Sequence, residues 1–109
     1  MTSDELLATL RNLELELRST RVQSFFTAQD AQTRARFAEC RQQVSSLVGG
    51  LTNAELSSIA TQLDALGGEL TAGAGRLKAR LVALDNGAAI LDSLAALLGL
   101  AARVVKQAS

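Results

Sequence analysis

The chain has 109 residues, and its 11 basic and 11 acidic side chains cancel to a formal net charge of zero. Hydrophobic residues make up 48% of it and aromatic residues 3%, while Pro and His are absent. A Leu- and Ala-rich chain without Pro favours helices over a turn-rich β fold. Without His it lacks the usual general base and the commonest metal ligand. A neutral chain also lacks the basic surface that nucleic-acid binding needs. We therefore expect a protein that is not an enzyme and takes no metal, cofactor or nucleic acid.

The length and the cysteine content predict one domain in a reducing compartment. A chain of this size typically forms one domain, so residues 1–109 are expected to be a single helical domain. One cysteine, Cys40, cannot form an intramolecular disulfide, which favours a reducing environment. Asp4 and Glu5 stand near the start without an apolar run, unlike a secretory signal. We expect a cytoplasmic location.

The first predicted helix covers residues 3–48, with Thr2 or Ser3 at its N-terminal cap. Two apolar seams follow helical spacing, one over Leu6, Leu10, Leu13 and Leu17, the other over Phe37, Cys40, Val44, Leu47 and Leu51. A row of Leu15, Phe26, Phe37 and Val48 steps by eleven residues, which favours one nearly straight helix. A break near Asp30, which could serve as an N-cap, is the alternative. Gly49-Gly50 is expected to end this helix.

The second predicted helix covers residues 53–84. Thr52 and Glu55 have the spacing of a capping box at its start. The glycines Gly67-Gly68 lie inside it and could break it, but the apolar phase continues across them, which favours a continuous helix. The small residues 72–75 would let a neighbouring helix come close. A turn signal at residues 85–87 is expected to end the helix.

The third predicted helix, residues 88–106, is apolar on most of its circumference. Polar side chains fall in one narrow stripe that contains Asp92 and Arg103. Such a helix lies at the centre of a bundle, against another chain or in lipid. The uncharged stretch over residues 93–102 is far shorter than the roughly 20 residues of a membrane span. Asp92 would also be costly in hydrocarbon, so a membrane contact is the weaker alternative.

These elements predict an all-α fold, a three-helix antiparallel hairpin or bundle with a long N-terminal helix and coiled-coil-like seams. Such a thin shape has little interior, and we expect it to leave part of the third helix for a partner to cover. The adjacent Phe25 and Phe26 point about 100° apart on a helix. One ring is therefore expected in the core and the other, Phe25, against a partner.

Motifs with specific chemistry are incomplete in this chain. The segment over residues 68–73 has two glycines at phosphate-loop spacing but lacks the Lys and Ser or Thr that should follow. Cys40 lies in an apolar seam without a histidine base, which indicates packing rather than catalysis. Basic clusters at residues 34–41 and 76–80 lack the interleaved aromatic residues that stack on bases.

We therefore expect a non-enzymatic helical assembly or adaptor protein that packs leucine seams in a homo-oligomer or a larger complex. Two alternatives are a membrane-active or lipid-surface protein that uses the third helix, and a small helical regulator or inhibitor of a larger protein. The predicted contacts to a protein partner, most simply a second copy, are Leu91, Leu94, Leu98 and Val105, then Leu6, Leu10, Leu13 and Phe25.

Overall fold

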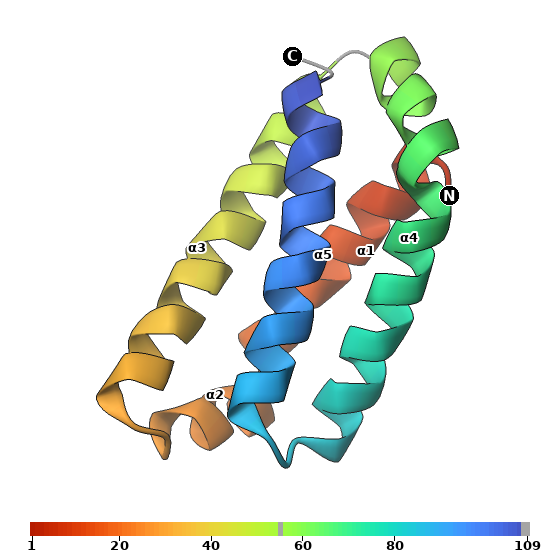
Figure 1. The fold of residues 1–109 in the computed structure, drawn as a ribbon. Helices are drawn as coiled ribbons and strands as arrows, with labels where there is room; N and C mark the ends of the chain where they lie inside the picture. The colour runs from red at the N-terminus through yellow and green to blue at the C-terminus, as the bar shows by residue number, and fades with distance from the viewer. Residues whose placement is uncertain (55, 108–109) are drawn as a thin grey trace.

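The computed structural model describes residues 1–54 and 56–107, without the side chain of Leu56. Over these ranges the chain forms helices and no strand, which confirms the all-α prediction. The five helices are α1 (Ser3–Leu17), α2 (Thr20–Thr27), α3 (Ala31–Asn53), α4 (Leu56–Ala83) and α5 (Gly87–Gln107) (Figure 1).

The prediction of one long helix over residues 3–48 is wrong, because the chain turns twice within it. At the first turn the Ser19 hydroxyl accepts a hydrogen bond from the Val22 N–H and caps α2. At the second, the Asp30 carboxylate accepts the Thr33 N–H at 2.8 Å and caps α3. The alternative break near Asp30 is thus confirmed, and a further break at Ser19 was not expected.

The turns explain why the eleven-residue row was misleading. Leu15 is exposed, whereas Phe26 and Phe37 are buried and their rings stack with centroids 4.2 Å apart. Residues eleven apart on one straight helix lie about 16 Å apart along its axis. The two rings meet because the chain folds back at Asp30, so burying them together favours the turn over a continuous helix.

The predicted boundary between the first and second helices is also wrong. α3 passes through Gly49-Gly50 and ends at Asn53. A Cβ on Gly50 would lie 2.8 Å from Cγ1 of Val105, so this glycine permits α3 and α5 to approach closely. Thr52, the expected cap, lies inside α3 and its hydroxyl donates to the Val48 carbonyl at 2.8 Å. Glu55, the other half of that capping box, lies outside the described residues.

The C-terminal half follows the sequence more closely. α4 runs without a break through Gly67-Gly68, as the apolar phase predicted. The expected turn follows it: Leu84 has a positive φ of 49°, and the Asn86 side-chain oxygen accepts the Ala89 N–H at 3.1 Å. α5 then starts at Gly87, one residue before the predicted boundary.

The four longer helices surround a shared core, and the short α2 closes one end (Figure 1). α5 packs most extensively on α4 and next on α3, while α1 packs on α3 and, less closely, on α4. The order around the bundle is therefore α1, α3, α5, α4. The chain measures 42 × 22 × 20 Å along its principal axes. The structure is thus a bundle of four longer helices closed at one end by α2, rather than the predicted three-helix hairpin or bundle.

The core is built almost entirely of aliphatic side chains. Within the described part of the chain, no polar or charged residue is buried in it. The largest share comes from α5, whose buried side chains include Ile90, Leu91, Leu94, Leu97, Leu98 and Val104. The expectation that this helix needs another chain to cover it is therefore wrong, since its apolar face is buried by α3 and α4 of the same chain.

Candidate functional site

Six of the eight predicted partner contacts lie in the chain's own core. Their side chains are at most 6% exposed, so a partner could contact very little of them unless the bundle opened. They are Leu6, Leu10, Leu13, Leu91, Leu94 and Leu98. The other two, Phe25 and Val105, are half-buried.

The two adjacent phenylalanines separate as their angle predicts. Phe26 is buried, while Phe25 meets it edge to face with centroids 5.1 Å apart. The Phe25 ring also lies close to Gly87, 3.6 Å from where a Cβ would stand. Phe25 therefore contacts the start of α5 within the same chain and is half-buried.

An open groove lies between α1 and α4, the adjacent helices that pack least closely. Its volume is about 420 Å³, and its floor is apolar. The α4 wall is low, because a Cβ on Gly75 would meet no atom within 4 Å. The floor consists of Leu13, Leu77, Leu81 and Leu97, the low wall of Ala74 and Gly75, and the polar rims of Thr9, Asn12 and Glu16 on α1 and Lys78 on α4.

Two exposed apolar side chains stand on the outer sides of these helices. Leu15 on α1 is 68% exposed and Val82 on α4 is 66% exposed, and no other large hydrophobic side chain of the described residues is as open. Val82 follows Lys78 by one turn on the same face of α4. Leu15 lies about 100° around α1 from Glu16 and points away from the core, opposite the buried seam. The groove and Val82 therefore give the α1–α4 side an accessible apolar surface.

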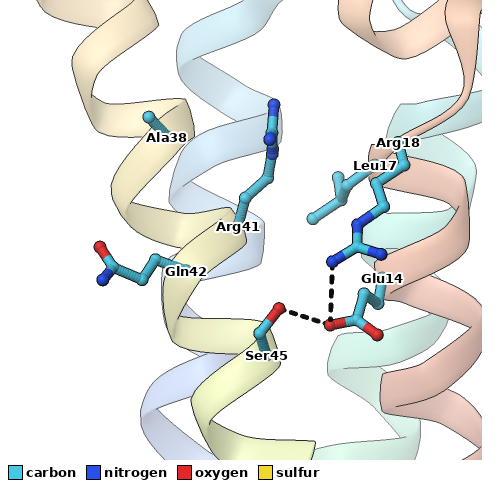
Figure 2. Close-up of a pocket in the computed structure, with 7 residues that line it drawn as sticks. All are labelled: Glu14, Leu17, Arg18, Ala38, Arg41, Gln42 and Ser45. Carbon is cyan, nitrogen blue, oxygen red and sulfur yellow. Dashed lines mark hydrogen bonds and ion pairs between the residues drawn. The ribbon is translucent and has the colours of Figure 1, made fainter.

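A second, polar pocket of about 160 Å³ lies between α1 and α3 (Figure 2). The Glu14 carboxylate accepts a hydrogen bond from the Ser45 hydroxyl and lies 3.7 Å from a guanidinium nitrogen of Arg18. On the α3 side, the Arg41 guanidinium stands 5.6 Å from the centre of the Phe37 ring. These groups are engaged with one another, so we interpret the pocket as a polar link between α1 and α3.

The titratable groups show little that resembles catalytic chemistry. Burial raises the pKa of the Cys40 thiol, which keeps it protonated and weakly nucleophilic at neutral pH. The hydrogen bond from Thr33 lowers the pKa of Asp30, as expected for a carboxylate that caps a helix. Over residues 1–54 and 56–107, no three His, Cys, Asp or Glu side chains cluster as metal ligands would.

One helix has the length and composition of a membrane span. Gly87–Gln107, which is α5, has a mean hydropathy of 1.9 over its most apolar window. Its large apolar side chains, however, face the core of the bundle. The same composition is typical of the central helix of a helical bundle.

No known protein family, curated protein or solved structure matches this chain. The functional proposal therefore depends on the α1–α4 groove and on the exposed Val82 beside it.

Proposed function

We propose that the protein is a non-enzymatic interaction protein that binds a helix of a protein partner along the α1–α4 groove. The observation that carries the proposal is an apolar groove beside an exposed aliphatic side chain, Val82. Grooves between helices commonly receive the apolar face of an amphipathic helix. The low wall at Gly75 supports the proposal, because small residues let a second helix approach closely.

The exposed Val82 side chain adds to the driving force for docking. Complete burial of a Leu or Val side chain is worth about 1.5–3 kcal/mol. Since Val82 is 66% exposed, covering it is worth about 1–2 kcal/mol. Interface residues that contribute measurably to binding cost more than about 1 kcal/mol on truncation, so this gain is of that order.

The proposal keeps the predicted class of function, protein association, and assigns it to a different surface of the molecule. Among the predicted contacts only Leu13 lines the groove. The residues on α5 serve the core instead. Association is thus assigned to the α1–α4 side.

A groove-filling substitution tests this proposal. Gly75→Leu places a side chain in open space and replaces a poor helix former, so the fold should remain stable. Gly68→Leu is the matched control, because Gly68 is also exposed and open, lies on the same helix, and is outside the groove. Immobilised wild-type and Gly68→Leu proteins should retain the same partner proteins, and Gly75→Leu should lose them. Identical retention by all three, or retention of no protein at all, a second copy of the chain included, would contradict the proposal.

A lipid-surface function is the second candidate, favoured by the span-like composition of α5. Ala96→Asp separates the two, because Ala96 is exposed in the bundle and tolerates a charge there. The same charge at the centre of a helix in hydrocarbon is unfavourable by about 2.5–3.5 kcal/mol. The groove proposal predicts that neither protein floats with vesicles of anionic phospholipid. Flotation of the wild type that Ala96→Asp abolishes would favour the lipid function instead.

A further inference from the structure

We infer that the helix received by the groove belongs to a second copy of this chain, docked about a two-fold axis that runs along the helices. This inference depends on the proposed function, since it names the partner for the same groove. It follows from the charges on the two rims, from the direction of α1 and α4, and from the position of Val82.

The rims carry opposite charges at the same level of the groove. Glu16 stands on α1 and Lys78 on α4, and both line one cavity. Neither side chain is in an ion pair with another described residue. A two-fold axis parallel to the helices and beside α4 seats α4 of each copy in the groove of the other, next to its α1. Glu16 then lies beside Lys78 of the second copy, and the symmetry repeats this pair.

α1 and α4 run in the same direction, which this arrangement requires. At one end, a Cβ on Gly67 of α4 would lie 3.4 Å from the Met1 nitrogen. At the other end, Arg21, just after α1, donates hydrogen bonds to the carbonyls of Leu81 and Val82, near the end of α4, at 2.7 and 2.6 Å. The two helices are therefore parallel, with both starts at one end of the bundle and both ends at the other.

The same axis also covers Val82. This side chain is 66% exposed and follows Lys78 by one turn on the same face of α4. When α4 docks in the groove of the other copy, Val82 is covered in both copies. Leu15 points away from the groove and stays outside this interface.

Neither charge nor size opposes such a dimer. The formal net charge is zero, so two copies have no net long-range repulsion. A standard interface buries about 800 Å² on each partner, which is about one eighth of this chain's 6053 Å² surface. One side of a chain that measures 42 × 22 × 20 Å is of that size.

Charge reversal tests the pairing of Glu16 with Lys78. Light scattering across a concentration series should show the wild-type mass rise from 11.4 kDa toward twice that value. Glu16→Lys and Lys78→Glu should each weaken the dimer about tenfold, because each places like charges on both symmetric pairs. The double reversal should restore the wild-type association. Glu39→Lys, an exposed reversal on α3, should leave the dimer unchanged.

The outcomes separate the inference from the function on which it depends. All substituted residues lie on the surface or rim, and circular dichroism should show unchanged helix content in each variant. A strict monomer that still retains a partner protein through Gly75 would overturn the self-docking and leave the proposed function standing. A dimer whose stability neither charge reversal changes would also overturn the self-docking, since the two copies would then contact each other through another surface. A monomer that retains no partner would refute both.

Discussion

Alanine substitution at three helical glycines should have effects of opposite sign. Gly68 and Gly75 on α4 are exposed, and a Cβ on either would meet no atom within 4 Å. Gly50 on α3 differs, because a Cβ there would lie 2.8 Å from Cγ1 of Val105 on α5. The chemical change is the same at all three positions, so the surroundings decide the outcome.

The magnitudes follow from helix propensity and packing. Gly in a helix interior is less favourable than Ala by roughly 0.5–1 kcal/mol, which Gly68→Ala and Gly75→Ala should each recover. The two positions are about 10 Å apart along the helix, so the gains should add to about 1–2 kcal/mol. At Gly50 the same gain opposes an overlap that costs about 1–3 kcal/mol. Val105 is β-branched and held to one rotamer in a helix, so it relieves little of that overlap.

Urea unfolding followed by circular dichroism measures these differences. The midpoint should rise for Gly68→Ala and Gly75→Ala and fall for Gly50→Ala, with an unchanged dependence on urea. In thermal unfolding, 1 kcal/mol corresponds to about 4 °C for a chain of this size. If Gly50→Ala stabilised the protein as much as the other two, the close approach of α3 and α5 would be wrong. A loss of stability at Gly68 and Gly75 would contradict a straight, open α4.

Four further predictions concern the core, a cap, an end link and the thiol. Leu94→Ala should destabilise the protein by about 2–5 kcal/mol in urea unfolding, because Leu94 is fully buried. Asp30 has a lowered pKa, so its contribution to stability should be complete above about pH 4 and lost as the pH falls through its pKa in the folded protein. Asp30→Asn should keep the helix cap and remove that part of the pH dependence of the urea midpoint. Arg21→Gln should speed amide hydrogen exchange around Leu84, since it removes the link to the end of α4. Cys40 should react slowly with a thiol reagent in the native protein and quickly in urea, because burial raises its pKa.

The sequence predicts the helical faces well and the helix ends poorly. The seam of Leu6, Leu10, Leu13 and Leu17 is buried as its spacing indicates, because spacing alone fixes which side chains share a face. The break at Ser19 depends on one hydroxyl cap of about 1 kcal/mol, which competes with simply continuing the helix. Gly49-Gly50 resembles a stop but lies inside α3, because the contact with Val105 comes from a residue more than fifty positions away.

The candidate groove could be predicted only in part. The small residues at Ala74 and Gly75 were a usable signal, since they form the low wall of the groove. The opposite charges of Glu16 and Lys78 carried no signal alone, because their proximity depends on α1 lying next to α4. The large number of apolar residues in α5 correctly indicated that this helix is buried, but not which helices bury it. Hydrophobic patterns are the same whether the covering helix belongs to the same chain or to another.

The order of helices around the bundle also bears on how the fold assembles. α4 and α5 are joined by a short turn, whereas α1 meets α4 across a sequence separation of about sixty residues, as in the link from Arg21 to Leu81. Closing a long loop costs more entropy than closing a hairpin, so contacts between neighbouring helices form more readily. We expect the α1–α4 seam to close last during folding and to open first in native fluctuations. The surface proposed for a partner therefore lies along the least strongly held seam of the bundle, where local opening can adapt its width to the helix that docks there.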